Sequence, residues 1–240
     1  MSWQKNCSSN AKKKKRPFYN LGYDFVKLTG GLPTWLWVRP KVYYPFGKPS
    51  KRGSMMVICN HVTWIDPIVV QLVFPWRRLN CLATKDLYSN KLVAWLFTQV
   101  HCIQVDKQNF QLSSFRQVVE RLQDGRLILI FPEGAIHTDS PDQVLAFKSG
   151  AVLMAHKAQA PILPMYIVQR EKWYHRQHVV MGQPIHVAQL LGPMPNMQQM
   201  NEVTELLREK EVELKSYYQS LLEKNRKKLS KKEREVAFYE

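Results

Sequence analysis

Short apolar runs alternate with segments of helical periodicity along the middle of the chain. Strand-like runs occupy residues 55–59, 80–84, 102–105, 126–131 and 162–168, and most of their side chains are aliphatic. Helix-like segments lie between them at residues 67–74, 89–100, 112–122 and 147–158. This order predicts an α/β fold: a largely parallel central sheet, connected by right-handed crossovers and covered by helices.

The ends of the chain differ from this middle part in charge and in aromatic content. The net charge of +16 is concentrated in a run at residues 12–16 and in a second basic stretch at residues 224–234. Such runs are commonly solvated tails, and they also match nucleic-acid arms. Residues 17–40, however, are rich in Trp, Tyr, Phe and Leu directly behind the first run, which suits a lipid headgroup boundary. We therefore expect a membrane surface, with anionic lipid, as a partner, and no nucleic acid.

The N-terminal segment is too interrupted to span a bilayer, because no stretch reaches the roughly 18 apolar residues that a spanning helix needs. The Gly30-Gly31-Leu32-Pro33 sequence should divide it into two short pieces. A polar-aromatic mixture follows the lysine run where a secretory signal would be continuously apolar. These features predict an N-terminal interfacial helical segment and a peripheral or monotopic membrane protein at the cytoplasmic face.

The C-terminal region reads as an amphipathic helix over residues 201–225, preceded by a linker at 193–201 that is rich in Pro, Met and Gln. Packing on the domain with one solvated face is the simplest role for it. The chain then divides into a basic tail (1–16), a membrane-interfacial segment (17–40), an α/β domain (41–192), and a linker with the C-terminal amphipathic, basic helix (193–240).

The segment NHVTWID at residues 60–66 directly follows the first strand-like run, in a turn of the kind where α/β proteins place chemistry. If the turn folds back, the Asp66 carboxylate accepts a hydrogen bond from one imidazole nitrogen of His61 and leaves the other nitrogen as a base. This is two-thirds of a serine triad, so the nucleophile could be the hydroxyl of a substrate. A purely structural turn histidine is the more common occurrence and remains the alternative.

Other common chemistries find little support in the sequence. The four cysteines have no CxxC spacing, and GxGxxG, GxxxxGK[ST], HExxH and GxSxG strings do not occur. His175 and His178 have no acidic or thiol partner nearby, so we expect a solvated loop there and not a metal pair. We expect no metal site.

Three further segments follow in a definite order: VHCIQVDK at residues 100–107, FPEG at 131–134 and FKSGA at 147–151. Together with NHVTWID, they resemble the glycerophosphate and lysophospholipid acyltransferase family, whose first motif is NHxxxxD and whose third is FPEG. The resemblance extends over roughly residues 40 to 190. It implies that His61 is the catalytic base and Asp66 its orienting partner.

The resemblance also implies a set of substrate-binding residues: Asn60, Lys107, Glu133, Gly134 and Lys148. Lys107 stands where the second family motif has an arginine that contacts the acceptor phosphate, and Ile136 stands where the third often continues with an arginine. Lysine keeps the charge but loses the bidentate fork of arginine. Lys148 is the candidate replacement, although a surface lysine at a helix start is an equally good interpretation.

The family resemblance implies an acyltransferase that moves a fatty acyl group to the free hydroxyl of 1-acyl-glycerol 3-phosphate, giving phosphatidic acid. No cofactor is expected; acyl-CoA or an acyl carrier protein thioester would be the co-substrate. The expected partners are the lysophospholipid acceptor, the membrane and, since basic tails suit an acidic protein, an acyl carrier protein. The alternatives are acylation of glycerol 3-phosphate or of another lysophospholipid, and a non-catalytic basic module that binds lipid or nucleic acid.

Overall fold

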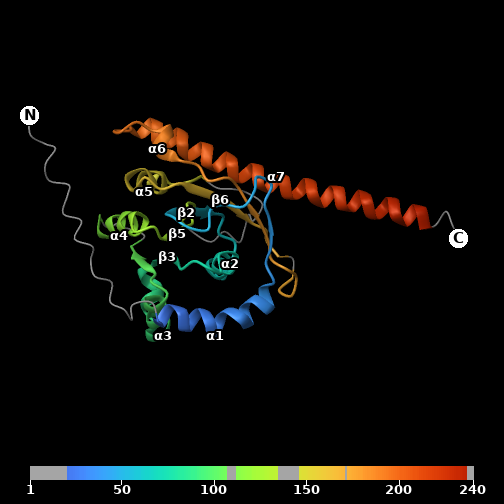
Figure 1. The fold of residues 1–240 in the computed structure, drawn as a ribbon, viewed down its shortest axis with the longest axis horizontal. Helices are drawn as coiled ribbons and strands as arrows, with labels where there is room; N and C mark the ends of the chain where they lie inside the picture. Colours follow the sequence, from blue (N-terminus) through green and yellow to red (C-terminus); the bar gives the residue numbers. More distant parts are fainter. Residues whose placement is uncertain (1–20, 107–111, 135–145, 171, 237–240) are drawn as a thin grey trace, which may run out of the picture.

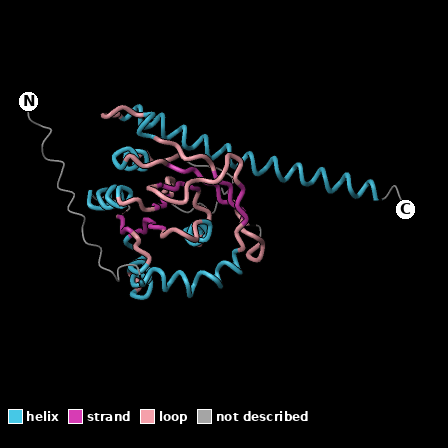
Figure 2. The backbone as a smooth tube through the Cα atoms, viewed as in Figure 1, coloured by secondary structure: helices cyan, strands magenta, loops and turns pink. Residues whose placement is uncertain are grey.

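A seven-stranded sheet forms the centre of the computed structural model, which describes residues 21–106, 112–134, 146–170 and 172–236 (Figures 1 and 2). The strands are β1 (Lys41–Tyr43), β2 (Met55–Cys59), β3 (Leu79–Thr84), β4 (Ile103–Val105), β5 (Leu127–Ile130), β6 (Ile162–Ile167) and β7 (His178–Met181). Their order in the sheet is β1-β7-β6-β2-β5-β3-β4, and all pairs are parallel except β6 with β7. The predicted α/β fold with a largely parallel sheet is thus confirmed.

Helices cover both faces of the sheet. One face carries α2 (Asp66–Val73) against side chains such as Val57, and the other carries α4 (Leu112–Gln123), α5 (Gly150–Ala158) and the short α6 (Val187–Leu190) against side chains such as Ile58. The 3₁₀ turn η1 (Lys85–Tyr88) and α3 (Lys91–Gln99) connect β3 to β4. Strands buried on both faces need an almost continuous apolar run, which is why the central strands were recognisable in the sequence.

The two strands β1 and β7 were not predicted. β7 includes His178, whose half-buried ring lies between the phenol groups of Tyr43 and Tyr218, so the expectation of a solvated loop is wrong for this residue. Burial lowers the pKa of His178, and the positive charges of Lys41 and Arg176 lower it further. These partners come from distant parts of the chain, and local sequence patterns do not reveal such contacts.

The N-terminal helix α1 (Leu21–Val38) is continuous, so the predicted break at Gly30–Pro33 is wrong. Pro33 removes the backbone donor to the Thr29 carbonyl oxygen, and the Thr34 hydroxyl bonds to the next carbonyl oxygen, that of Gly30, at 2.6 Å. Buried Tyr23 and Val38 fix both ends of the helix. Helix α1 also packs against α2 and α3. Among the described residues, no helix is long and apolar enough to cross a membrane.

The C-terminal helix α7 (Met197–Val236) begins four residues earlier than expected, inside the predicted linker. Asn196 caps it: its side chain accepts the Gln199 backbone N–H at 2.8 Å, and the Gln199 side chain accepts the Asn196 N–H at 3.0 Å. The first half of α7 packs on β6, β7 and α5, on the side of the sheet opposite α1, and the second half extends past the domain (Figure 1). The basic tail at residues 1–16, Lys107 and Ile136 lie outside the described residues.

Candidate active site

The turn between β2 and α2 brings His61 and Asp66 together. The His61 Nδ1 atom lies 2.9 Å from Asp66 Oδ2; the histidine side chain is 16% exposed, whereas the aspartate is buried. His61 follows the carboxyl end of β2, the edge of a parallel sheet where ligands are usually bound. The pairing predicted from the NHxxxxD spacing is therefore present in the structure.

The Asp66 carboxylate also organises the turn itself. Its Oδ2 atom accepts the backbone N–H groups of Val62 at 2.7 Å and Thr63 at 2.8 Å, and Oδ1 accepts the Thr63 hydroxyl at 2.6 Å. Because its partners are donors, the ionised carboxylate matches this site, and the proton of neutral His61 belongs on Nδ1. The lone pair on Nε2 is then available to a substrate.

Phe131, the first residue of FPEG, stacks on the His61 ring with the ring centroids 3.8 Å apart and an angle of 12° between the planes. Phe131 directly follows β5, the neighbour of β2 in the sheet. The stacked ring limits rotation of the imidazole and shields one of its faces. The stacking of Phe131 on His61 was not predicted; the available signal was that Phe131 is the first residue after β5 and His61 the second after β2, its parallel neighbour.

The FPEG and FKSGA segments meet at this edge. The Lys148 backbone N–H donates to the Pro132 carbonyl oxygen at 3.1 Å, and a side chain at Gly134 would place its Cβ 3.0 Å from the Lys148 ammonium nitrogen. Gly134 has φ +78°, a conformation that favours glycine. Lys148 is exposed and Glu133 is partly buried. The two segments thus form one surface beside His61, while their binding roles stay predictions.

Asn60 has a structural contact that the sequence did not reveal. Its buried side chain donates to the Ile167 carbonyl oxygen at 2.9 Å and accepts the Ile167 N–H at 2.8 Å. This pair of bonds joins the end of β2 to the end of β6 and fixes the residue that precedes His61. The predicted contact of Asn60 with a substrate stays a prediction.

Cys59, the last residue of β2, is buried in the apolar core, with three acidic groups near enough to affect its thiol. Burial raises the pKa of its thiol, and the carboxyl groups of Asp66, Glu211 and Glu133 raise it further. A thiol with a raised pKa is a poor nucleophile, because the thiolate is the reactive form. Covalent catalysis through Cys59 is therefore disfavoured, although it lies two residues from His61.

Two cations at the same edge of the sheet were not predicted from the sequence. Lys85 directly follows β3 and is exposed, and Arg170 follows β6. The Arg170 guanidinium lies 5.2 Å from the ring centroid of Trp37. Burial lowers the pKa of Arg170, and the nearby Asp66 carboxylate partly opposes this shift. The signal for both was their position just after a strand; Lys107 lies outside the described residues.

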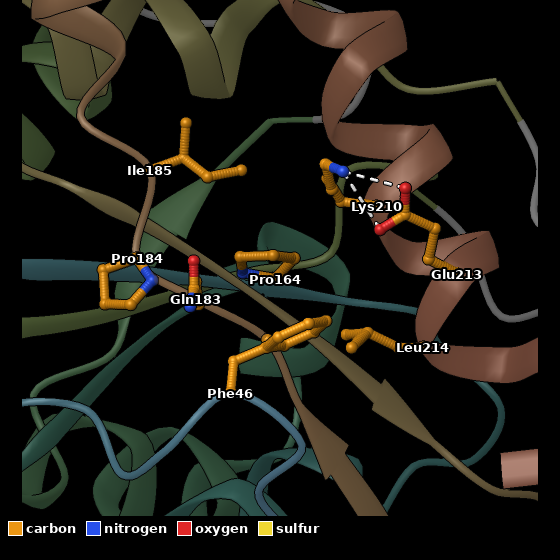
Figure 3. A pocket seen from close by; sticks show the side chains of 9 residues that line it. Phe46, Pro164, Gln183, Pro184, Ile185, Lys210, Glu213 and Leu214 are labelled. Atoms are coloured by element: carbon orange, nitrogen blue, oxygen red, sulfur yellow. Dashed lines mark hydrogen bonds and ion pairs between the residues drawn. The ribbon is translucent and has the colours of Figure 1, made fainter. Parts of the chain in front are cut away.

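No group of three or more His, Cys, Asp or Glu side chains suited to a metal ion occurs in the described part of the chain. A recess of about 170 Å³ lies against α7 and the strands β6 and β7, and neither His61 nor Asp66 lines it (Figure 3). It is lined mainly by Phe46, Pro164, Pro184, Ile185 and Leu214, beside an ion pair of Lys210 with Glu213. This recess has no titratable group suited to acid–base chemistry beyond that pair, so the chemistry resides at His61.

The comparisons with known proteins point to one family. Residues 42–168 match the family model described as Acyltransferase. The chain is 25% identical over 181 residues to the 1-acyl-sn-glycerol-3-phosphate acyltransferase of Bacillus subtilis (strain 168), which covers 73% of this chain and 88% of that protein. It is 31% identical over 150 residues to the protein of the same name from Limnanthes alba, covering 61% of this chain and 52% of that protein.

A solved structure agrees on the fold. The crystal structure of the 1-acyl-sn-glycerophosphate (LPA) acyltransferase PlsC from Thermotoga maritima matches with a TM-score of 0.59 at 19% identity, covering 82% of this chain and 80% of that chain. At this identity the likeness concerns the fold alone. The family match, by contrast, extends over more than half of the chain and includes both the NHVTWID and the FPEG segments. This chain belongs to the acyltransferase family.

Proposed function

We propose that this enzyme transfers a fatty acyl group from an acyl thioester to the free hydroxyl of 1-acyl-glycerol 3-phosphate, giving phosphatidic acid for phospholipid synthesis. The observation that carries the proposal is the His61–Asp66 pair, with Nδ1 held at 2.9 Å and Nε2 left available at the carboxyl edge of the sheet. The names of the Bacillus and Limnanthes relatives support the acceptor.

The reaction needs a base and no protein nucleophile. As the acceptor hydroxyl attacks the thioester carbonyl carbon, its proton passes to His61 Nε2 and the new C–O bond forms. The tetrahedral intermediate then collapses, the C–S bond breaks, and the imidazolium returns the proton to the departing thiolate. Asp66 stabilises the imidazolium through the bond to Nδ1. Atoms and charge balance without a cofactor, and acyl-CoA or an acyl carrier protein supplies the thioester.

The acceptor phosphate requires cations near the base. Lys148 lies against Gly134, and Lys85 and Arg170 follow strands that end at the same edge. Lysine binds a phosphate as a point charge, and arginine can bind it through two parallel hydrogen bonds. We propose that these side chains, together with Lys107, form the phosphate-binding part of the site.

An exposed apolar surface supports association with a membrane. Helices α1 and α3 lie in contact, and both expose large apolar side chains. The members are Leu21, Phe25, Leu28, Leu32, Trp35 and Leu36 on α1, with Leu92, Trp95 and Leu96 on α3. A large exposed apolar patch on a protein surface usually marks a contact with another protein or with a membrane. Since the acceptor is a lipid, we propose that this surface rests on the membrane, at the cytoplasmic face.

The acceptor is tested with the purified protein and product detection by mass spectrometry. Three acceptors are compared, namely 1-acyl-glycerol 3-phosphate, glycerol 3-phosphate and lysophosphatidylcholine, each with acyl-CoA and with an acyl carrier protein thioester. We expect phosphatidic acid from the first acceptor with at least one donor. Preferential acylation of another acceptor would correct the substrate, and no acyl transfer to any acceptor would refute the proposed activity.

The membrane surface is tested by flotation with neutral and anionic vesicles. Replacing Phe25 and Trp35 by Ser should weaken binding to both vesicle types, because apolar insertion does not depend on lipid charge. Met194 is 94% exposed and precedes α7, a helix on the side of the sheet opposite α1 (Figure 1), so Met194→Ser provides the control variant. Equal binding by the double variant, the control and the unmodified protein would rule out this surface.

A further inference from the structure

Helix α7 buries a carboxyl group in the middle of its apolar stripe. Glu211 is 0% exposed, and it lies four residues after Leu207 and three before Leu214, both buried on the same face. Both carboxyl oxygens are shielded from solvent. A leucine would continue the stripe at this position, so the sequence places an acidic residue where packing alone calls for an apolar one.

The two motif turns of the active site lie near Glu211, because α7 packs on β6, the neighbour of β2 in the sheet. The Asn60 backbone N–H approaches its carboxyl group, too loosely for an ordinary hydrogen bond, and Glu133 of FPEG lies near enough to interact electrostatically. Asn60 directly precedes His61, and Glu133 is two residues from Phe131, the ring stacked on His61. Glu211 therefore lies close to the residues that position His61.

Burial and the neighbouring carboxyl group determine the charge state of Glu211. Burial raises the pKa of Glu211, the Glu133 carboxylate raises it further, and the Asn60 N–H lowers it in part. Two carboxyl groups at close range cannot both ionise cheaply, so the protonated form of Glu211 is favoured. A protonated carboxyl group both accepts and donates a hydrogen bond, unlike an apolar side chain at the same place.

Such a group lowers stability where it stands, because a buried polar group with weak hydrogen bonding costs free energy relative to an apolar side chain. Residues that break a local packing rule in this way tend to occur at functional sites. The location of Glu211 between the NHxxxxD and FPEG turns specifies which function it could serve.

We propose that Glu211 is a positioning residue of the acyl transfer site, which holds the backbone of Asn60 and the side chain of Glu133 in place from α7. This inference rests on the proposed function. The side chain of Asn60 is bound to Ile167, and its backbone N–H faces the Glu211 carboxyl group. The C-terminal helix thereby becomes part of the support for the catalytic turn, beyond covering the sheet.

The test compares two substitutions at this position in the full-length protein. Glu211→Leu removes the polar group but continues the apolar stripe, so we expect an unchanged or higher Tm together with a fall of about 10- to 100-fold in kcat/KM for the acceptor. The donor KM should change little, because Asn60 and Glu133 are proposed to bind the acceptor and not the acyl donor. Glu211→Gln keeps one acceptor and one donor and should stay within about threefold of the unmodified enzyme.

The control is Leu207→Ala, on the same face of α7 and also buried. It should lower Tm by about 5 to 15 °C by leaving a cavity, with unchanged acceptor KM. Wild-type acceptor kinetics in Glu211→Leu overturn the inference. So does a loss of more than tenfold in Glu211→Gln, or a lower Tm in Glu211→Leu with kinetics that match the control. No acyl transfer by the unmodified enzyme would instead reject the proposed function.

Discussion

Replacing Asp66 by Asn separates its two roles, which are to hold the turn and to stabilise charge on His61. The Oδ2 atom accepts three donors: the Val62 N–H, the Thr63 N–H and His61 Nδ1. The amide oxygen of the substituted side chain must take this place, because an NH₂ group would face two N–H groups. The amide nitrogen then faces the Thr63 hydroxyl, which can turn to accept. The turn and the histidine tautomer are therefore preserved.

What the Asp66→Asn variant lacks is the negative charge. A hydrogen bond to a charged group contributes about 1.5 to 3 kcal/mol, and losing that amount in the transition state lowers kcat roughly 10- to 150-fold. This loss is smaller than the ~10⁴-fold effect of forcing the wrong tautomer in serine-protease triads. Asp66→Ala, in contrast, leaves the Val62 and Thr63 N–H groups unpaired at about 1 to 3 kcal/mol each. That variant should lose stability as well as activity.

The assay is steady-state acyl transfer at saturating acceptor, with Tm measured for each variant. Thr63→Val serves as the control, because it removes only the hydroxyl bond to Oδ1 and leaves Oδ2 and His61 untouched. An Asp66→Asn variant that keeps its Tm and loses less than threefold in kcat would show that the negative charge of Asp66 does not stabilise the His61 imidazolium. A lower Tm in Asp66→Asn than in Thr63→Val would show that the amide does not replace the carboxylate in the turn.

Three further outcomes are expected. Phe131→Leu should lower kcat by about 2- to 10-fold with little change in either KM, because an aromatic pair contributes roughly 0.5 to 1.5 kcal/mol beyond its buried area. Lys85→Ala should raise the acceptor KM by about tenfold or more and spare the donor KM, whereas Lys157→Ala, at the far end of α5, should change neither. The pKa of Glu211 is raised in the folded protein, so its contribution to the free energy of unfolding is largest at acid pH and is lost as pH rises; urea titrations over a pH series should show a flatter dependence for Glu211→Gln.

The pattern of apolar residues correctly predicted the central strands, which are buried on both faces of the sheet. The strand predicted at residues 55–59 coincides with β2, and the run at 126–131 contains β5 with one extra residue at each end. These strands are apolar throughout, so few other conformations suit them. The three-residue strand β1 and the strand β7 beside it depend on partners far away in the chain, and no local pattern specifies them.

The prediction of a break in α1 was wrong for a related reason. Gly30, Gly31 and Pro33 each disfavour a helix, and the neighbours that override them, buried Tyr23 and Val38 and the packing on α2 and α3, are tertiary contacts. Intrinsic propensity is a weak guide where packing holds both ends of a segment.

The residues of the candidate active site also differ in whether local sequence or the folded structure reveals them. Local spacing sufficed for the His61–Asp66 pair, because the two residues belong to one turn. Three other site residues follow the ends of other strands, namely Phe131, Lys85 and Arg170. Only the order of the strands in the sheet brings them to the same edge as His61. The sequence shows Glu211 as an acidic residue within an apolar helix stripe. Its neighbours Asn60 and Glu133 could be identified only from the folded structure.

His61 is the residue on which the proposed acyl transfer depends most, as the base for the acceptor hydroxyl. The direct measurement is phosphatidic acid production from an acyl thioester and 1-acyl-glycerol 3-phosphate by the unmodified enzyme and by His61→Ala, with folding checked by circular dichroism. We expect a loss of at least about 100-fold, the lower end for general-base catalysis, at unchanged secondary structure. A folded His61→Ala variant that forms phosphatidic acid at the unmodified rate would contradict the mechanism.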